Sequence, residues 1–160
     1  MSRKVSFRLF LVPVLALVAL AGITGAAASP PSPASGTFAA RNGTFNSVRF
    51  AGGNVIIDLS AEEDYTGTLS GTATLHGTLV HHAYGDADFQ GIEVFTGTVD
   101  GVPGTLTFNV SARTDAGGWR AMEVILSGSD GLANLHGVLT EDGTLPPRMG
   151  TYTGELHTAP

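Results

Sequence analysis

The sequence predicts an all-β protein, a single antiparallel barrel of about eight strands that follows an N-terminal signal peptide. Apolar and polar residues alternate with period two through much of the chain, as in strands with one buried face. After residue 28, no ten-residue stretch has the apolar stripe of a helix. The pair Gly-Thr followed by an apolar residue occurs nine times in 160 residues. Glycine repeated inside strands indicates strongly curved sheet, which favours a closed barrel over a sandwich.

Residues 1–28 have the features of a signal peptide. Three basic residues lie within the first eight positions, an apolar run extends from Leu9 to Leu20, and small residues follow at Ala26 to Ala28. Cleavage after Ala28 predicts a secreted, extracellular protein. A retained anchor is the alternative, because the uncharged stretch that ends at Ala28 is long enough to span a bilayer core. In both cases the positive end stays inside and the domain is exported.

Composition excludes several classes of function. The formal net charge is −6, and loss of the three basic residues in the signal peptide would leave a mature chain near −9 without any lysine. Its arginines are scattered, so we expect no nucleic-acid partner and no membrane partner after signal cleavage. The chain has no cysteine, which removes disulfides, thiol nucleophiles and Cys-ligated metals. We predict no cofactor, and the oligomeric state stays open.

The mature chain divides into a proline-rich spacer at residues 29–35 and a barrel domain at residues 36–157. The spacer, "SPPSPAS", is expected not to pack. Turns are expected at residues 51–53, 100–101, 116–118 and 142–143, where glycine follows or adjoins a small or acidic residue. Strands are expected near residues 37–41, 45–50, 54–59, 65–75, 88–99, 105–113, 119–126, 138–140 and 151–157.

The clearest strand covers residues 105–113. Leu106, Phe108, Val110 and Ala112 share one face, and polar residues occupy the other. The repeated Gly-Thr pair fits the same pattern, because threonine suits the wet face and the apolar residue after it points inward. Glycine there ends a turn or relieves crowding where a strand bends. We interpret the repeat as a construction rule for curved sheet and not as a binding motif.

Two stretches resemble a known family. "FQGIEVFTGTVDGVPGTLTF" at residues 89–108 and "GSDGLANLHG" at residues 128–137 are similar to an uncharacterised, largely actinobacterial family assigned an allene oxide cyclase-like barrel. Leu106, Asp130 and Asn134 depart from the family pattern. The resemblance implies an eight-stranded antiparallel barrel of the allene oxide cyclase or dirigent type with a mostly apolar cavity, and it implies no activity. The matching residues are Gly91, Glu93, Phe95, Gly97, Gly101 and Gly104.

Glu93 is the most informative single residue. Counting by twos places it on one strand face with Phe89 and Phe95. A carboxyl group buried among aromatic rings would have a raised pKa and would be a weak candidate for a catalytic acid or a ligand anchor. The alternative is a carboxylate that pairs with an arginine such as Arg113, or one that faces solvent. The period alone does not decide between these positions.

Other polar motifs have simpler interpretations. His81, His82, Asp86 and Asp88 are close in sequence, but adjacent histidines on a strand point to opposite faces, so a polar hairpin is favoured over a metal site. "AEED" at residues 61–64 is interpreted as a solvated turn. The chain has neither a Gly-x-Ser-x-Gly elbow nor a phosphate-binding glycine loop, so hydrolase and nucleotide chemistry lose support.

The leading functional prediction is a secreted barrel that binds a small apolar or amphipathic molecule in its interior. One alternative is a cyclase or isomerase of the allene oxide cyclase type, with Glu93 acting beside Tyr65 or Asn109. Another is a structural or surface-interaction barrel with a filled core. The sequence favours binding over catalysis. The expected cavity-wall residues are Tyr65, Leu69, Glu93, Phe95, Leu106, Phe108 and Trp119.

Overall fold

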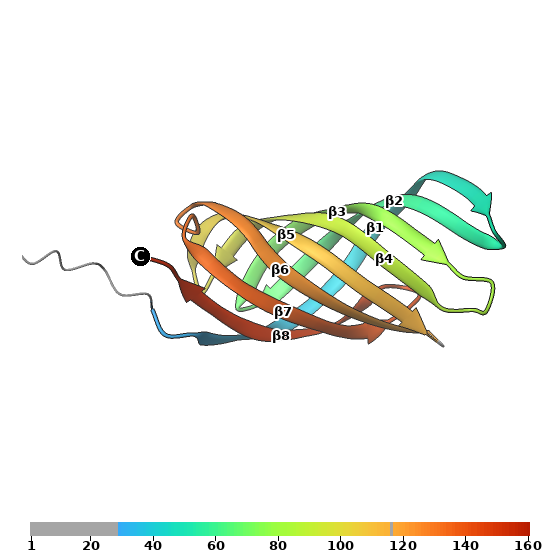
Figure 1. The fold of residues 1–160 in the computed structure, drawn as a ribbon. Coiled ribbons are helices and arrows are strands. Elements are labelled where there is room, and N and C mark those ends of the chain that lie inside the picture. The colour runs from blue at the N-terminus through green and yellow to red at the C-terminus, as the bar shows by residue number, and fades with distance from the viewer. Residues whose placement is uncertain (1–28, 116) are drawn as a thin grey trace, which may run out of the picture.

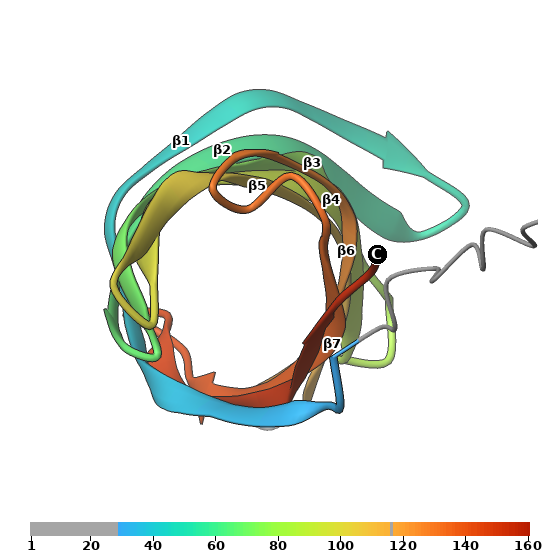
Figure 2. The ribbon, with the colours of Figure 1, turned by 90° about the vertical axis from the view of Figure 1, so that its left-hand side faces the viewer.

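The computed structural model describes residues 29–115 and 117–160, and it is a closed barrel of eight antiparallel strands (Figure 1). Each strand pairs with the next, and β8 returns to pair with β1, which closes the ring seen end-on in Figure 2. This confirms the predicted fold class. The strands are β1 Ser32–Ala51, β2 Asn54–Gly67, β3 Leu69–His81, β4 Ala87–Val99, β5 Val102–Asp115, β6 Gly118–Asp130, β7 Leu135–Thr144 and β8 Met149–Thr158.

The predicted signal peptide, residues 1–28, lies outside the described residues and stays a prediction. Within the described part of the chain, no helix is long and apolar enough to cross a membrane.

The first strand begins earlier than the sequence suggested. Ser32 pairs with Leu156 of β8, and the side chain of Ala34 is buried. β2 reaches only as far as Gly36, so residues 32–35 form ladder bonds on one side alone. Such an edge position tolerates proline, which has no N–H to donate. The segment assigned to a spacer therefore supplies the start of β1, and the predicted boundary at Gly36 lies too late.

The predicted strand and turn boundaries near Gly67 and Gly143 were wrong, and the strands expected at residues 37–41 and 45–50 are one strand, β1. The expected strand at residues 65–75 is broken by Gly67, which has a φ of 109° and ends β2. The expected turn at residues 142–143 lies within β7, and the chain turns after Thr144 instead. The paired prolines Pro146 and Pro147 cannot donate ladder bonds, which explains why the strand stops before them.

The Gly-Thr repeat has the structural meaning that the sequence suggested. Gly77, a glycine of the repeat, lies opposite Gly91 at inward positions of β3 and β4, and the ring of Phe89 packs over both. A Cβ atom on Gly91 would lie 2.6 Å from Phe89 Cζ, so only glycine leaves room for the ring. Aromatic side chains thereby fill the space that inward glycines leave open.

The middle of the barrel is filled, and a hollow lies at each end, of about 440 Å³ at one and about 280 Å³ at the other. Apolar side chains from all eight strands form a single buried cluster through the middle of the barrel. At the end where the turn between β6 and β7 lies, Leu132 folds inward and is buried. At the other end, β1 separates from β8 after Ala39 and continues with β2 as a projecting hairpin (Figure 1). The exposed rings of Phe45 and Phe50 lie on this hairpin.

Candidate functional site

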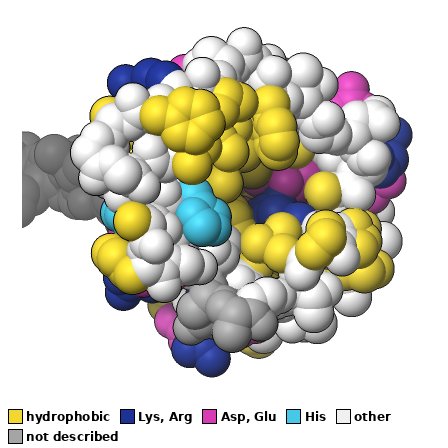
Figure 3. All heavy atoms as spheres, turned by 90° about the vertical axis from the view of Figure 1, so that its right-hand side faces the viewer, with side chains coloured by type: hydrophobic (Ala, Val, Ile, Leu, Met, Phe, Trp, Pro, Cys, Tyr) yellow, Lys and Arg dark blue, Asp and Glu magenta, His cyan; other side chains and the backbone are white. Residues whose placement is uncertain are grey.

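A cavity of about 440 Å³ opens at the end of the barrel that carries the β1–β2 hairpin. Figure 3 looks into this end and shows hydrophobic side chains around a hollow with charged side chains at its base. Glu63 and Arg148 are the charged residues that line it, and His81 and three hydroxyl side chains also contribute. The volume falls in the range of about 300–1,000 Å³ that is usual for small-molecule sites. The apolar part of the lining is Ala40, Phe45, Leu59, Ala61, Leu75, Leu79, Ala87, Phe89, Trp119, Leu145 and Pro146.

Beneath the apolar walls lies a cluster of buried charged groups. Period-two alternation points one glutamate inward from each of four strands: Glu63 from β2, Glu93 from β4, Glu123 from β6 and Glu141 from β7. Each is almost completely inaccessible to solvent. Arg148, from the loop between β7 and β8, is 8% exposed and is the only buried cation among the described residues. The cluster therefore contains four carboxyl groups and a single guanidinium.

Arg148 is held from several directions. Its guanidinium forms ion pairs with Glu63 and Glu141. Its Cζ atom lies 4.7 Å from the centroid of the Phe38 ring and 4.4 Å from that of Trp119, so both contacts are cation–π interactions. The backbone carbonyl of Arg148 accepts a hydrogen bond of 2.8 Å from Ala40, which fastens the loop to β1. The base of the cavity is therefore a fixed arrangement of charges.

Glu141 has the most complete set of partners in the cluster. The Tyr65 hydroxyl donates to Glu141 Oε1 at 3.0 Å, and the Trp119 indole N–H donates to Glu141 Oε2 at 3.0 Å. A second acceptor, Glu123 Oε1, lies 3.4 Å from the same hydroxyl. Burial, followed by the surrounding carboxylates, raises the pKa of Tyr65 well above its ordinary value, so the hydroxyl keeps its proton and acts as donor.

Glu93 and Glu123 favour their protonated forms. Burial raises the pKa of Glu93 from 4.5 to about 8, and the nearby carboxylates of Glu63 and Glu141 add to the shift. Burial likewise raises the pKa of Glu123 well above its ordinary value. Neither oxygen of Glu93 has a hydrogen-bond partner among the described residues. A neutral carboxylic acid is much cheaper to bury than a carboxylate, so burial favours the protonated form of both groups.

Glu63 differs from the other glutamates because it lines the cavity. It faces Arg148 through Oε1, whereas its Oε2 is buried and has no hydrogen-bond partner among the described residues. Burial raises the pKa of Glu63, and the charge of Arg148 opposes the shift. Glu63 is thus a solvent-excluded acceptor at the base of a cavity, with one oxygen unused.

The structure places all seven predicted wall residues inside the barrel, where they are buried. Of these, Trp119 lines the cavity described above. Tyr65 and Glu93 belong to the buried polar cluster, whereas the remaining residues fill the core: Leu69, Phe95, Leu106 and Phe108. Their role in ligand binding stays a prediction.

The two alternatives for Glu93 are not seen. Its side chain is fully buried, whereas Arg113 lies on the outer surface, where it faces Asp86 at 3.4 Å and Asp88 at 3.5 Å. Asn109, proposed as a partner of Glu93, was placed wrongly, because it is exposed on the outer face of β5. Phe108, its neighbour in the chain, takes the inward position.

The sequence reasoning missed three acidic members of the cluster and Arg148. "AEED" is part of β2 and not a solvated turn, and within it Glu63 lies two residues before the inward Tyr65. Glu123 lies at period two from Trp119, so strand alternation could have identified both glutamates. Arg148 comes from a loop, and no periodic signal marks it.

The loop between β3 and β4 is a polar hairpin connection, as predicted. His82 Nε2 lies 3.0 Å from Asp88 Oδ2, and the His82 ring stacks on Tyr84. Among the residues that the structure describes, no group of three or more His, Asp or Glu side chains is arranged to hold a metal ion. His81, from the same segment, lies at the cavity lining.

Comparison with known proteins supports the fold and names a family. Residues 34–144 match the family described as "Protein of unknown function (DUF3224)". A crystal structure of a DUF3224 protein of unknown function from Shewanella oneidensis MR-1 superposes with a TM-score of 0.69 at 18% identity, covering 82% of this chain and 100% of that one. Such low identity shows the fold alone. No curated protein matches the chain.

The expected membership of an uncharacterised family is confirmed, whereas the likeness to allene oxide cyclase stays a prediction. The family match extends over more than half of the sequence. The chain therefore belongs to the DUF3224 family of proteins of unknown function.

Proposed function

We propose that the protein binds one small, mostly apolar molecule in the cavity at the open end of its barrel. The observation that carries this proposal is a cavity of about 440 Å³ with apolar walls, larger than the hollow of about 280 Å³ at the opposite end of the barrel. Its apolar surface would gain about 0.8 kcal/mol for each methylene group that a ligand buries there. Shape and burial would supply most of the affinity, and Glu63 and Arg148 would orient the polar end.

Small side chains at lining positions support a site formed before the ligand arrives. Ala61 and Ala87 occupy inward positions near the mouth, where larger residues would fill the space. The closed sheet and the loop held to β1 fix the walls. A preformed site costs little ordering entropy on binding.

Fluorescence of the chain's single tryptophan tests the proposal, because Trp119 lines the cavity. Titration with 1-octanol should change its emission and saturate. The variant Ala61→Leu should weaken binding by about tenfold or more, equivalent to about 1.4 kcal/mol, because the added side chain occupies the cavity. Ala133→Leu adds the same bulk to the hollow of about 280 Å³ at the opposite end, so it is the matched control and should bind as the wild type does. No saturable change with any probe, or equal loss in both variants, would contradict binding in the cavity.

The natural ligand and the compartment can be examined together. We propose that the mature protein is exported, on the evidence of the basic and apolar segments in residues 1–28. N-terminal sequencing of secreted protein should begin at Ser29 or within a few residues of it, and native mass spectrometry should show a bound small molecule. Recovery of the intact chain only in membranes would contradict cleavage.

A cyclase or isomerase is the second candidate. The observation in its favour is Glu93, a buried acid whose pKa of about 8 suits proton exchange near neutral pH. Binding ranks ahead because Glu93 is absent from the cavity lining, whereas Glu63 belongs to it. Incubation with a reactive unsaturated epoxide should give one enantiomer of the cyclised product with the wild type and a racemate with Glu93→Gln. Racemic product from both proteins would rule catalysis out for that substrate class.

A further inference from the structure

We infer that the cavity takes an amphipathic amine, with the protonated nitrogen bound by Glu63 and the hydrocarbon body against the apolar walls. This inference rests on the proposed binding function and adds the chemical class of the ligand. It draws on two observations that are independent of each other: the balance of charge at the base of the cavity and the unused oxygen of Glu63.

The charge at the base is uneven. Glu63 and Glu141 both face the guanidinium of Arg148, so two carboxyl groups share one positive charge. Burial raises the pKa of Glu63, and the charge of Glu141 adds to the shift, because ionising both groups leaves one negative charge in excess. Removal of charge from water is costly, and an excess negative charge in this place has little solvent to offset it. A ligand cation would cancel the net negative charge of Glu63, Glu141 and Arg148. A neutral ligand would leave that net charge unchanged, and an anion would double it.

Both faces of Arg148 are already occupied. The rings of Phe38 and Trp119 pack against its guanidinium, and two carboxylates take up its charge. Nε of Arg148 has no hydrogen-bond partner among the described residues, but a ligand carboxylate bound there would be a third acidic group around one buried guanidinium. The added negative charge argues against a fatty acid or another organic anion as the occupant.

The unpartnered oxygen of Glu63 favours a ligand that donates hydrogen bonds. Its Oε2 atom is an acceptor that is fully buried, lacks a hydrogen-bond partner among the described residues and belongs to a side chain that lines the cavity. A protonated amine has only donors, and its hydrogen bonds to a carboxylate are charge-assisted and among the strongest in proteins. A hydroxyl group could donate to the same oxygen, but it would leave the charge uneven.

The walls indicate an organic cation and not a metal ion. Most of the lining is aliphatic or aromatic, and rings such as Phe89 offer neither charge nor oxygen ligands. A hydrated metal ion would gain nothing from that surface, whereas an alkyl or aryl group would gain burial. Phe89 and Trp119, whose ring centroids lie 5.7 Å apart, give the wall its aromatic part.

Three probes with the same eight-carbon chain separate the alternatives: octylamine, 1-octanol and octanoate. Each is titrated against the mature protein by calorimetry at neutral pH and about 0.15 M salt, where charges more than about 8 Å apart are largely screened. Octylamine is a cation and octanoate an anion under these conditions. We expect octylamine to bind at least tenfold more tightly than 1-octanol and octanoate at least tenfold more weakly.

The variant Glu63→Gln tests the assigned residue. It keeps the shape of the side chain and removes the charge, so octylamine should lose at least tenfold in affinity, whereas 1-octanol, which carries no charge, should lose much less. Saturable binding of 1-octanol to the variant also shows that the variant is folded with its cavity intact. Glu155→Gln, which removes a carboxylate from the outer face of β8, is the control for total charge and should change nothing.

The outcomes distinguish this inference from the function on which it rests. Octanoate binding as tightly as octylamine, or octylamine binding that survives Glu63→Gln, would overturn the inference and leave ligand binding in place. Failure of all three probes would overturn the proposed function itself. Should Glu63→Gln not fold, the order of the three probes in the wild type still decides the inference.

Discussion

The guanidinium of Arg148 lies over the indole ring of Trp119, with 4.4 Å between Arg148 Cζ and the ring centroid. Both residues line the cavity, and both bind Glu141, the indole through its N–H and the guanidinium through an ion pair. The wall of the cavity is thereby tied to its charged base. A ligand that contacts either residue would affect the other, so the stability of the barrel and the properties of the site depend on the same side chains.

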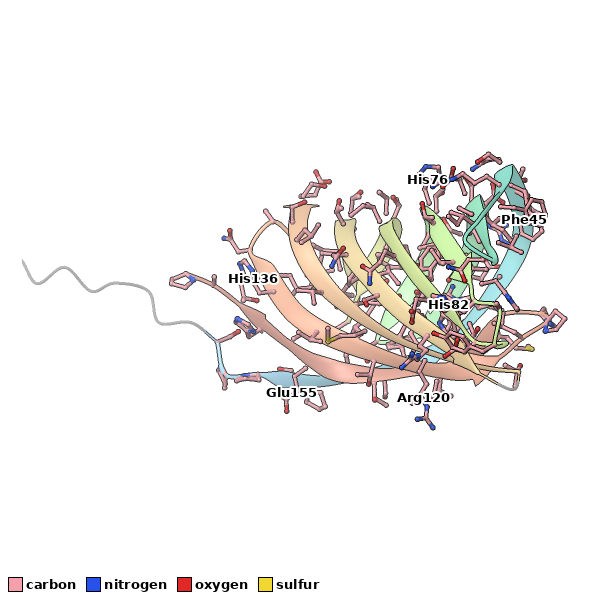
Figure 4. All side chains as sticks on the ribbon, turned by 45° about the vertical axis from the view of Figure 1, so that its right-hand side comes forward. Phe45, His76, His82, Arg120, His136 and Glu155 are labelled. Atoms are coloured by element: carbon pink, nitrogen blue, oxygen red, sulfur yellow. The ribbon has the colours of Figure 1, made fainter. Side chains whose placement is uncertain are left out.

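Replacement of Arg148 by methionine should destabilise the protein by about 3–5 kcal/mol, because it leaves Glu63 and Glu141 buried without a cation. Urea unfolding measures the change. Arg120→Met is the matched control, since Arg120 is 84% exposed, points away from the barrel (Figure 4) and pairs with exposed Asp142. We expect the control to change stability by about 0.5 kcal/mol or less. Equal losses of stability in the two variants would show that the buried ion pairs contribute no more to stability than the exposed pair.

Replacement of Glu93 by glutamine should flatten the dependence of stability on pH. The pKa of Glu93 is raised from 4.5 to about 8, so the folded protein holds a proton that the unfolded chain releases. Stability from this group is complete below pH 4.5 and is lost as pH rises toward 8. One pKa unit corresponds to about 1.4 kcal/mol, so the loss amounts to several kcal/mol.

Urea unfolding from pH 5 to pH 9 compares Glu93→Gln with the wild type, and the variant should be the more stable of the two at the alkaline end. Glu155→Gln, on the outer surface (Figure 4), should keep the slope of the wild type. A Glu93→Gln protein with an unchanged slope would contradict a protonated Glu93 in the folded state.

Replacement of Gly91 by alanine should cost about 1–3 kcal/mol through overpacking. The new Cβ would lie 2.6 Å from Phe89 Cζ and 2.7 Å from the carbonyl oxygen of His76, so the ring or the backbone would have to shift. Gly43→Ala is the control, because among the described residues no heavy atom outside the neighbouring residues of the chain lies within 4 Å of the added methyl group. Thermal unfolding distinguishes the two variants, and equal melting temperatures would show that the inward glycine has no packing role.

Replacement of Tyr152 by phenylalanine should destabilise the barrel by about 1–3 kcal/mol. The Tyr152 hydroxyl accepts a hydrogen bond of 2.7 Å from the buried N–H of Leu69 and donates one of 3.2 Å to the Thr66 carbonyl. The variant leaves the Leu69 N–H without its side-chain acceptor at the turn between β2 and β3. Tyr84→Phe removes a hydroxyl from a ring that is 75% exposed and should change stability little. Similar losses in both variants would mean that this hydrogen bond is not what holds the turn.

The fold could be predicted from the sequence because strand alternation is a local signal. The inward set on β5, which includes Leu106 and Phe108, followed directly from period two. Glu93 was harder, since its neighbours Ile92 and Val94 are also apolar and yet are 41% and 42% exposed. With apolar residues on both faces, the pattern does not say which face is buried.

The turn after β7 and the residues of the site could not be predicted from local patterns, because both depend on tertiary contacts. Asp142 and Gly143 form a sequence typical of a hairpin turn, but β7 continues through them because both β6 and β8 pair with that segment. Arg148 meets Glu63 only because closure of the barrel brings the last loop against β2. A contact between segments so far apart in the chain leaves no periodic trace in the sequence.

A crystal structure of the mature protein grown with octylamine tests the assignment of the cavity most directly. It should show the alkyl chain against the apolar walls, with the nitrogen within about 3 Å of Glu63 Oε2 and the pairs of Arg148 intact. An empty cavity at saturating octylamine, or an amine bound only on the outer surface of the barrel, would contradict it.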